Sequence, residues 1–442
     1  MRRARRQRGG WAAWTRWALS LSLVSALIAG TSQEAAAADR PAGPHPADVS
    51  WVRVARVSAI SADGRIVTYA VDSGFSPSQP AYIDFVTDVA TGSTVRLTRG
   101  DRRGSYGAGM TADGRFLVVN RQKEDKTWQL LVCHRVDLAC TRADVDSAGH
   151  PGNGTSDGEW LSGNGRYLAF DSTSSDLVPG DTNHDTDVFV RDLWSGTTTR
   201  VNLGPGGRQA NGQSGGSVIS ANGRYVAFES WATNLVPGDT NHTNDVFVRD
   251  VWTGTTTRVN LGPGGRQANS TDTGSFLHLS ADGRYVVFYS YATNLVAGDT
   301  NRMPDVFVRD RRFGTTHRVS VGPGGRQANG GSLPDGVSAD GRYVTFSSDA
   351  TNLVAGDTNG MNDAFVRDLR YGTTRRVSLG AGGRQADQDS GGAVISADGR
   401  YVAFASWATN LVPGDTNTAS AAFVRDLWTH ATRRVSPDPT AG

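Results

Sequence analysis

The sequence predicts an all-β protein, a seven-bladed β-propeller of four-stranded antiparallel blades. The first observation is a nine-residue segment, SADGRYVAF in its last copy, which recurs with variation from Ser61, Thr111, Ser162, Ser220, Ser280, Ser338 and Ser396. The second is a seventeen-residue segment that recurs five times, for example as NLVPGDTNHTNDVFVRD at 234–250. The third is the composition, because 54 Gly among 442 residues suits strands joined by many turns. Repeats at regular spacing indicate a repeat architecture.

Residues 1–38 have the features of a secretory signal peptide. MRRARRQRGG is a basic start, Ala18–Gly30 is an apolar core, and the small residues that follow allow cleavage after Ala37 or Ala38. The core is shorter than the roughly 20 apolar residues of a membrane-spanning helix, although an uncleaved anchor is the alternative. We therefore expect a secreted, extracellular protein with no membrane span after cleavage.

Signal cleavage also changes the charge balance. Residues 1–38 contain six Arg and one Glu, so the mature chain keeps 45 − 6 = 39 basic and 43 − 1 = 42 acidic residues. This balance predicts no nucleic-acid partner.

The remaining chain divides into a Pro-rich leader (39–50), the propeller (51–437) and a short tail (438–442). In each repeat a short strand precedes an Asp-Gly or Asn-Gly hairpin turn, RYVAF is the second strand, DVFVRD the third, and TTTRV the fourth after a turn such as LWTGT. The uninterrupted apolar run VFV predicts a strand covered on both faces. A β-helix has much shorter repeats, and one such unit alone cannot bury two sheet faces. VRVARV at 52–57 is a candidate for an extra outer strand that closes the ring.

The two cysteines, Cys133 and Cys140, lie seven residues apart with a predicted turn between them. In an exported protein this spacing favours a disulfide across a hairpin, between the third and fourth strands of the second blade. Metal binding is the alternative, but no recurring His or Cys partners accompany the pair.

The alternation of strands assigns the recurring loops to two faces of the disc. The Asp-Gly and LWTGT turns share one face, here called the turn face, and the ATNLVPGDTN loops and GPGGRQANG connectors share the other, the loop face. We expect the loop face to bind the ligand.

The acidic loops carry the candidate metal ligands. Asp, Asn and Asp at positions 1, 3 and 7 of four of the five loops are similar to the start of an EF-hand calcium loop, and the fifth loop has Ala421 at position 7. The candidates are Asp181, Asn183, Asp185, Asp187, Asp239, Asn241, Asp245, Asp299, Asn301, Asp305, Asp357, Asn359 and Asp363.

The match to that calcium loop is incomplete. Position 6 is never Gly, and the acid at position 12, such as Asp250, lies on the opposite face of a strand from position 7. Two alternatives stay open, a weak calcium site and Asx turns that shape the loop. For the acids at position 12, we expect a role as turn caps.

Two further sets of repeated residues are candidates for binding. An arginine follows paired glycines in four connectors, and it either faces an anion or pairs with a loop aspartate of an adjacent blade. These residues are Arg208, Arg266, Arg326 and Arg384. Trp194, Trp252 and Trp428 recur in the hairpin turns, where they either cover the edge of the core or stack on sugars.

Catalytic motifs are weak. Ser156 and Ser214 fit G-x-S-x-G, but they lie between predicted strands, and the motif needs a strand–turn–helix. A glycosidase needs two carboxyl groups, and the mature chain has only three Glu: Glu124, Glu159 and Glu229. A unique site would use unrepeated residues of the first three blades, and the candidates are Asp125, His134, His150, Asp157 and Glu159.

The segments SADGRYVAF, DVFVRDL and TTTRV together resemble the WD40-like repeat of TolB-type β-propellers, from about Trp51 to Ser436. The resemblance implies the fold, but the family includes binding scaffolds, interaction domains, propellers attached to peptidases, and lyases. TolB has an additional α/β domain for which the repeats leave no room, so we do not expect the role of TolB.

The expected function is that of a secreted, monomeric, non-catalytic scaffold that binds a protein or a glycan, with calcium as the one cofactor considered. The alternative is an extracellular polysaccharide-active enzyme, a lyase or a hydrolase, with its site at the mouth of the central channel. A cluster of unrepeated acidic and His side chains at that mouth would favour the enzyme.

Overall fold

The computed structural model describes residues 53–72, 82–97, 105–270, 276–415 and 419–437. The predicted signal peptide, Pro-rich leader and tail lie outside these residues. No helix within the described residues has both the length and the apolar character needed to cross a membrane.

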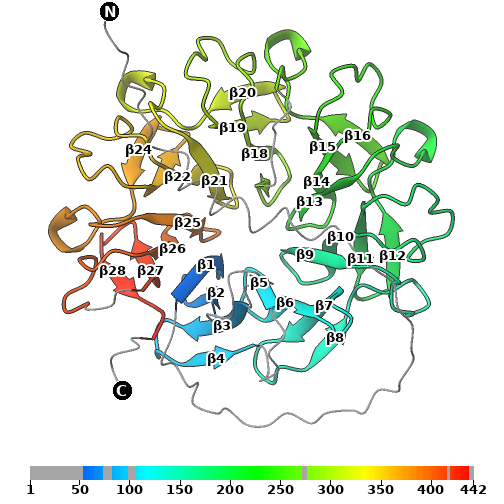
Figure 1. The fold of residues 1–442 in the computed structure, drawn as a ribbon, viewed down its shortest axis with the longest axis horizontal. Coiled ribbons are helices and arrows are strands. Elements are labelled where there is room, and N and C mark those ends of the chain that lie inside the picture. The colour runs from blue at the N-terminus through cyan, green and yellow to red at the C-terminus, as the bar shows by residue number, and fades with distance from the viewer. Residues whose placement is uncertain (1–52, 73–81, 98–104, 271–275, 416–418, 438–442) are drawn as a thin grey trace, which may run out of the picture. The chain divides into compact units, whose positions relative to one another are not determined.

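Twenty-eight strands of the described residues form seven antiparallel sheets of four, and Figure 1 shows the sheets arranged as a ring in chain order. The strands of blades 1 to 3 are β1 Arg53–Ile60, β2 Ile66–Asp72, β3 Tyr82–Asp88 and β4 Thr94–Arg96; β5 Ser105–Met110, β6 Phe116–Gln122, β7 Trp128–His134 and β8 Cys140–Arg142; β9 Ser156–Leu161, β10 Tyr167–Ser172, β11 Asp187–Asp192 and β12 Thr197–Arg200. Those of blades 4 and 5 are β13 Ser214–Ile219, β14 Tyr225–Ser230, β15 Asp245–Asp250 and β16 Thr255–Arg258; β17 His278–Leu279, β18 Tyr285–Ser290, β19 Asp305–Asp310 and β20 Thr315–Arg318. Those of blades 6 and 7 are β21 Ser332–Val337, β22 Tyr343–Ser348, β23 Asp363–Asp368 and β24 Thr373–Arg376; β25 Ser390–Ile395, β26 Tyr401–Ser406, β27 Ala421–Asp426 and β28 Thr432–Arg434.

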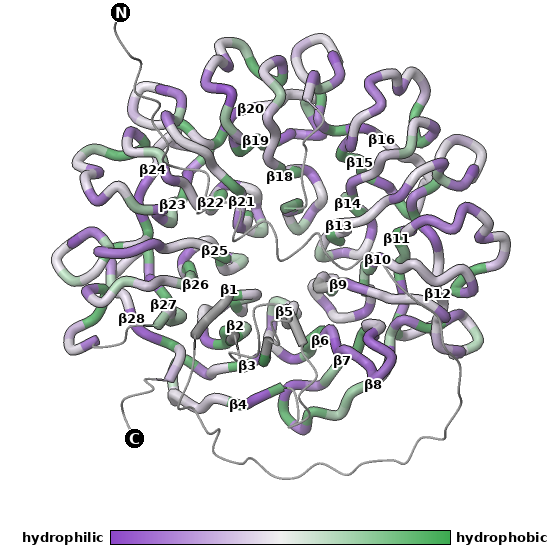
Figure 2. The backbone as a smooth tube through the Cα atoms, viewed as in Figure 1, coloured by the Kyte–Doolittle hydropathy of each residue, from purple (hydrophilic) through white to green (hydrophobic). Residues whose placement is uncertain are grey.

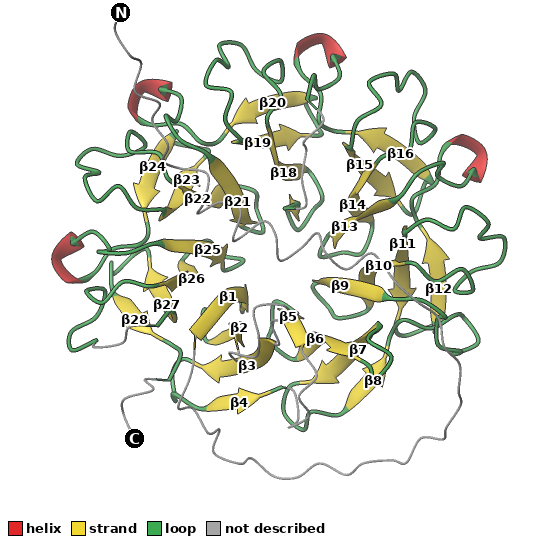
Figure 3. Ribbon diagram, viewed as in Figure 1, coloured by secondary structure: helices red, strands yellow, loops and turns green. Residues whose placement is uncertain are grey.

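Four short 3-10 turns follow blades 3 to 6 and contain the glycines of the connectors, at η1 Pro205–Gly207, η2 Pro263–Gly265, η3 Pro323–Gly325 and η4 Ala381–Gly383. Figure 3 shows them in red at the outer edge of the ring, and the sheets confirm the predicted seven-bladed propeller.

The core lies between blades. Ala169 and Val188 of blade 3 pack in one buried cluster with Ile219 and Phe228 of blade 4, and corresponding clusters recur around the ring. Val188, Phe189 and Val190 are all buried, so the VFV strand is covered on both faces as expected. Figure 2 shows the hydrophobic segments mainly on the strands and the hydrophilic ones mainly in outer loops.

Phenylalanines on the second and third strands stack within five blades. The ring centroids lie 5.5–5.9 Å apart in the pairs Phe170–Phe189, Phe228–Phe247, Phe288–Phe307, Phe346–Phe365 and Phe404–Phe423. The ten rings are fully buried, and aromatic pairs at this spacing add about 0.5–1.5 kcal/mol each beyond their burial.

The ring closes by packing between complete blades. Blade 1 and blade 7 each consist of four consecutive strands, and Val57 and Tyr69 of blade 1 pack in one buried cluster with Ala405 and Val424 of blade 7. β1, which contains residues 53–57 of the VRVARV segment, is the innermost strand of blade 1 and pairs with β2. The expectation of an extra outer closing strand was therefore wrong.

Neighbouring blades also meet through their turn glycines. A Cβ atom at Gly283 of blade 5 would overlap the Tyr225 ring of blade 4, and Gly64 of blade 1 meets Tyr401 of blade 7 in the same way. The backbone N–H of Ala221 donates to the carbonyl of Ala281, 3.0 Å away, in the next turn. The contact therefore repeats at the junction that closes the ring.

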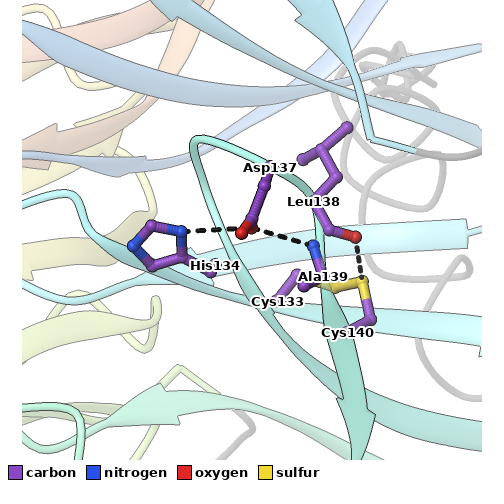
Figure 4. Close-up of a disulfide and its surroundings, with 6 residues drawn as sticks. All are labelled: Cys133, His134, Asp137, Leu138, Ala139 and Cys140. Atoms are coloured by element: carbon purple, nitrogen blue, oxygen red, sulfur yellow. Dashed lines mark hydrogen bonds and ion pairs between the residues drawn. A yellow bond between two sulfur atoms is a disulfide. The ribbon is translucent and has the colours of Figure 1, made fainter. Parts of the chain in front are cut away.

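The predicted disulfide is present. Cys133 and Cys140 face each other on β7 and β8 and are bonded to one another (Figure 4). Between them, Asp137 accepts a hydrogen bond of 3.1 Å from the backbone N–H of Ala139 and lies 3.1 Å from His134 Nδ1. Closing so short a loop stabilises the fold by about 2–3 kcal/mol in the chain-entropy model.

A matched pair of alanine substitutions tests the packing of turns between blades. Gly264 and Gly283 have φ values of 69° and 72°, but only Gly283 has a neighbouring side chain in the way. We expect Gly264→Ala to cost about 1 kcal/mol for the left-handed backbone. Gly283→Ala should cost about 1–3 kcal/mol more because the Tyr225 ring must move. Urea unfolding followed by fluorescence measures both, and equal losses would show that the Tyr225 contact contributes nothing.

Candidate functional site

Each of the five acidic loops surrounds a buried arginine from the end of the fourth strand of its own blade. In blade 4, Arg258 Nη2 lies 2.5 Å from Asp239 Oδ2 and Arg258 Nη1 lies 3.5 Å from Asp245 Oδ2. Equivalent ion pairs join Arg200 to Asp181 and Asp187, Arg318 to Asp299 and Asp305, Arg376 to Asp357 and Asp363, and Arg434 to Asp415. The fifth loop has Ala421 at position 7, so Arg434 pairs with Asp415.

The asparagine at position 3 connects this ion pair to the next connector. Asn301 Nδ2 donates to Asp305 Oδ2 at 3.1 Å and to the carbonyl of Ala328 at 3.1 Å. Its Oδ1 accepts from the backbone N–H of Met303, as an Asx turn does. Burial raises the pKa of Asp305 to about 6, although the Ser320 hydroxyl and Arg318 act in the opposite direction.

These contacts do not support a calcium site in the acidic loops. A guanidinium group already pairs with the carboxylates at positions 1 and 7, and no group of three or more His, Cys, Asp or Glu side chains in the described ranges could hold a metal ion. Asp185 occupies position 5 in the first loop only. It takes no part in the ion pairs that join Arg200 to Asp181 and Asp187. The sequence suggested calcium or Asx turns, and the buried arginine was not among the alternatives considered.

The acids at position 12 cap turns, as expected. Asp250 Oδ1 accepts hydrogen bonds from the backbone N–H groups of Trp252 and Thr253, and both its carboxylate oxygens accept from the Arg224 guanidinium. The pKa of Asp250 is lowered because the hydrogen bonds from Arg224, Thr253 and Trp252 outweigh the effect of burial, the largest single influence.

The connector arginines do not pair with a loop aspartate. All four side chains are exposed, and Arg208 Nε donates to the carbonyl of Pro205 in its own turn at 3.3 Å. The reason is that the 3-10 turn carries the side chain outward, whereas the buried arginines of the fourth strand already occupy the acidic loops. A ligand-binding role for Arg208, Arg266, Arg326 and Arg384 stays a prediction.

The connectors and acidic loops do share a face, as predicted. Gln267 of one connector donates to the carbonyl of Gly238 at 2.6 Å, in the acidic loop of blade 4, and its own carbonyl accepts from Asn294 of blade 5 at 2.8 Å. Each such connector therefore fastens two consecutive blades.

The turn face carries a row of outward aromatic side chains, here called the aromatic arc. One aromatic residue stands in the turn between the third and fourth strands of each of blades 3 to 7, and each is 66–69% exposed. The aromatic arc consists of Trp194, Trp252, Phe313, Tyr371 and Trp428. The three tryptophans therefore do not cover the core, which was one of the two expected roles.

An arginine lies between each residue of the aromatic arc and a tyrosine of its own blade. Arg224 lies 4.9 Å from the ring centroids of both Tyr225 and Trp252, and Asp250 holds its guanidinium at 2.7 Å. The corresponding arginines of the other four blades lie 4.6–5.2 Å from Trp194, Phe313, Tyr371 and Trp428. The stacks orient the rings and keep one surface of each open to solvent.

A groove of about 360 Å³ lies on the turn face between blades 6 and 7. Tyr371 and Trp428 of the aromatic arc line it, together with Arg375, Arg425 and His430. The groove thus combines two exposed rings with several cations.

Unrepeated acids gather around the innermost strands of blades 3 and 4. Asp157 on β9 stands opposite Asp171 on β10, and Asp171 accepts a hydrogen bond of 2.6 Å from the backbone N–H of Gly216 on β13. Glu229 on β14 is 6% exposed, with Oε2 accepting from Asn244 at 2.9 Å and Oε1 buried without a partner. In each blade the first strand begins and the second strand ends on the loop face. Asp157 lies near the start of β9, and Asp171 and Glu229 lie near the ends of β10 and β14. These three acids, here called the acid cluster, therefore lie toward the loop face.

The pKa values of Asp171 and Glu229 in the acid cluster are strongly raised. Burial raises the pKa of Glu229 to about 8, and Asp171 acts in the same direction despite the hydrogen bond from Asn244. Burial likewise raises the pKa of Asp171 to about 7, and the charge of Asp157 adds to it. Nearby, burial lowers the pKa of His278 to about 4 and raises that of Asp335 to about 6.

Most of the catalytic candidates from the sequence lie apart. Asp125 is exposed beside Lys123, His134 pairs with Asp137, and His150 pairs with Asp146, so only Asp157 belongs to the acid cluster. Glu159 lies on β9, but its side chain is outside the described part of the structure.

The two serines of the G-x-S-x-G matches have structural partners. Ser156 and Ser214 are buried at the start of β9 and β13, where their hydroxyls bond to Ser172 and Ser230 at 2.9 and 2.8 Å. Neither stands in a strand–turn–helix.

Asp171 and Glu229 were missed because they stand within repeated strands. Comparison of the fifth position of the second strand across the repeats would have found them, because that position varies: Ala70, Asn120, Asp171, Glu229, Tyr289, Ser347 and Ala405.

No protein-family model and no curated protein sequence match the chain. Among solved structures, oligogalacturonate lyase from Vibrio parahaemolyticus is similar, with a TM-score of 0.52 and 14% identity over 87% of this chain and 92% of that one. The propeller domain of the Trilobed protease from Pyrococcus furiosus has a TM-score of 0.52 and 9% identity over 88% and 99% of the two chains. An oligogalacturonate lyase in complex with manganese has a TM-score of 0.51 and 14% identity over 85% and 89%.

At these identities the similarity shows the fold alone. TolB from Acinetobacter baumannii is also among the matches, at a TM-score of 0.40. In this chain the first and last blades exchange no strand among the described residues. The chain is therefore a β-propeller similar in fold to a lyase and to the propeller domain of a protease.

Replacement of Arg258 tests the account of the acidic loops. Arg258→Met should lower the free energy of unfolding by about 3–5 kcal/mol, because it leaves Asp239 and Asp245 buried without their cation. Arg266→Met, in an exposed connector, is the control and should change it by less than about 0.5 kcal/mol.

The same account predicts that the wild-type protein melts at one temperature in millimolar calcium and in chelator. A calcium-dependent rise of several degrees, abolished by Asp239→Ala with Asp245→Ala, would instead establish a calcium site. Differential scanning calorimetry gives both results.

The buried carboxyl groups predict a pH-dependent stability. Their pKa values are higher in the folded protein than in the unfolded chain, so their contribution is present at low pH and is lost as the pH rises through about 7 to 8. Between the ordinary carboxyl pKa and its raised value of about 8, Glu229 should cost about 1.4 kcal/mol per pH unit, and above that value the cost should stay constant. Glu229→Gln should flatten the loss between about pH 5 and 8, whereas the exposed Glu124→Gln should not. Parallel stability curves for wild type and Glu229→Gln in urea unfolding would refute the raised pKa.

Proposed function

We propose that the protein is a secreted, monomeric, non-catalytic scaffold whose turn face binds an extended glycan. The observation that carries the proposal is the aromatic arc, five rings in equivalent positions on consecutive blades, each 66–69% exposed. Large apolar rings are seldom left so open on a surface with no binding role. The sequence features of a signal peptide and the Cys133–Cys140 disulfide support export.

A glycan suits the aromatic arc better than a protein does. Sugar rings present flat surfaces of C–H groups, and these pack against the negatively charged face of an aromatic ring. Equivalent platforms on successive blades suit a ligand whose units also repeat, because several weak contacts on one chain combine into firm binding. A protein partner instead requires one large, closely complementary patch with a central cluster of contact residues.

A polysaccharide-active enzyme, either a lyase or a hydrolase, is the second candidate. Asp171 and Glu229 favour it, because hydrolysis of glycosidic bonds uses two carboxyl groups of which one is protonated. Against it, Glu229 is 6% exposed and one of its oxygens is bound by Asn244. The platforms of the aromatic arc also lie on the opposite face of the propeller from the acid cluster.

Substitution of the aromatic arc tests the proposal. We expect Trp194→Ala with Trp252→Ala to weaken binding of a polysaccharide about 10- to 100-fold, from about 0.5–1.5 kcal/mol for each lost aromatic contact. Trp231→Ala is the matched control, because Trp231 is 45% exposed but follows β14 on the loop face. Affinity electrophoresis against a panel of soluble plant and microbial polysaccharides measures the change.

Two outcomes would contradict the proposal. One is that no polysaccharide of the panel retards the wild type, and the other is that the double variant and Trp231→Ala migrate like the wild type. Release of reducing or unsaturated ends by the wild type, abolished in Glu229→Gln, would favour the enzyme.

A further inference from the structure

We propose that the groove between blades 6 and 7 is a subsite for an anionic sugar unit, one that bears a carboxylate or a sulfate. The proposal rests on the proposed glycan-binding function and names the class of glycan. The groove has a volume of about 360 Å³, which is large enough for a sugar ring, and two members of the aromatic arc stand at its sides.

The walls of the groove can hold a sugar ring. Tyr371 and Trp428 are 67% and 69% exposed, and they stand in equivalent turns of neighbouring blades. Arg342 and Arg400 lie 5.1 and 4.6 Å from their ring centroids and orient them. Both rings are therefore fixed in place and open to solvent before any ligand arrives, which lowers the entropy cost of binding.

The groove has an excess of positive charge. Two of its arginines are neutralised, since Arg342 pairs with Asp368 at 2.7 Å and Arg376 pairs with Asp357 at 2.8 Å. Arg425 instead donates to the carbonyl of Leu379 and to the Thr432 hydroxyl, both at 2.8 Å. Arg375 is exposed and forms no ion pair with any described residue, and His430 adds a ring nitrogen at the edge. An anion is the ligand that this arrangement attracts.

Arg375 and His430 distinguish this groove from the corresponding grooves between blades 3 to 6. Arg375 stands where blades 3, 4 and 5 have Thr199, Thr257 and His317. Arg375 has no carboxylate partner among the described residues, and at the corresponding position blades 3 and 4 have an uncharged side chain, whereas blade 7 has Arg433. Arg425 is 5% exposed and recurs as an arginine in blades 3 to 6, so Arg375 is the cation that sets this groove apart from those beside blades 3 and 4.

His430 has a left-handed backbone conformation. It occupies the turn position that is Gly196, Gly254, Gly314 and Gly372 in blades 3 to 6, with φ at 60°, and Leu138 has φ at 53° at the same position of blade 2. This conformation is unfavourable for a residue with a Cβ atom, and strain of this kind concentrates at binding sites. A histidine where four sister turns have glycine supplies a hydrogen-bond donor at the entrance to the groove.

The test restores the residues of the sister repeats, so that the variants keep a turn and strand already present in this fold. Arg375→Thr with His430→Gly should weaken binding of a β-1,4-linked glucuronate oligosaccharide about tenfold or more. Binding of the matched glucose oligosaccharide, which differs in having a hydroxymethyl group for each carboxylate, should not change. Binding of the acidic oligosaccharide should also fall with added salt, because the charges are partly exposed. Isothermal titration calorimetry on the mature protein measures all four combinations, and Lys126→Thr, which removes an exposed cation from the loop between β6 and β7 on the opposite face, is the control.

The outcomes separate this proposal from the one on which it rests. Equal affinity of the wild type for the two oligosaccharides, or unchanged affinity of the variant for the acidic one, would overturn the anionic subsite while leaving the aromatic arc untouched. Loss of acidic binding in the groove variant, with no effect of Trp194→Ala and Trp252→Ala, would support the subsite and refute the aromatic arc. A sulfated glucose oligosaccharide distinguishes the two anions, and its loss of binding in the variant would also support the proposal.

Discussion

The structure depends on one constraint, that no blade covers its own apolar faces. The buried clusters combine side chains of adjacent blades, such as Val188 with Phe228, and the cluster of Val57 and Tyr69 with Val424 repeats this contact between the first and last blades. A row of blades would leave two apolar faces in water, so the ring must close. Because packing alone closes it, every blade must present nearly the same two faces to its neighbours. This requirement explains why the stacked phenylalanines, the turn glycine against tyrosine, and the buried arginine with its aspartates recur around the ring.

The buried arginine shows how the same requirement acts on charge. Asp239 and Asp245 are almost inaccessible, and isolated carboxylates in such a place would be costly. Arg258, from the end of the fourth strand of the same blade, pairs with both and fastens the long loop to the outermost strand. The acidic loops therefore contribute to the fold, and no group of three or more His, Cys, Asp or Glu side chains among the described residues could hold a metal ion. Functional chemistry must then be sought where the repeats differ or where repeated side chains are turned to solvent.

The sequence was sufficient for the fold because the Asp-Gly or Asn-Gly turns, the apolar strands and the similar spacing of the seven repeats all predict the same four-stranded unit. It also predicted the disulfide and the turn-capping acids, since these depend on contacts within one hairpin. It did not predict the partner of the acidic loops, because Arg258 follows Asp239 by nineteen positions and only the folded blade brings them together. Arg208 lies on the same face as the loop aspartates, and pairing with one of them was one of its two expected roles. The structure shows no such pair among the described residues, and the sequence could not reveal this because the pairing depends on the folded blade. Asp171 and Glu229 escaped notice because both stand in otherwise repeated strands of different blades, and their proximity is a property of the ring.

The two faces of the propeller offer different chemistry for a physical reason. On the loop face, connectors and acidic loops bond to one another, so several of their polar groups already have partners within the fold. On the turn face, the hairpins are too short to cover their own aromatic residues, and each ring lies over an arginine with its outer surface free. Since the hairpins are alike, the platforms repeat from blade to blade, which provides affinity for a repeating chain but no means of telling one chain from another. Such discrimination requires a departure from the repeat. Arg375 and His430 are such departures, and they fall in the same groove, where they combine the repeated platforms with a local charge.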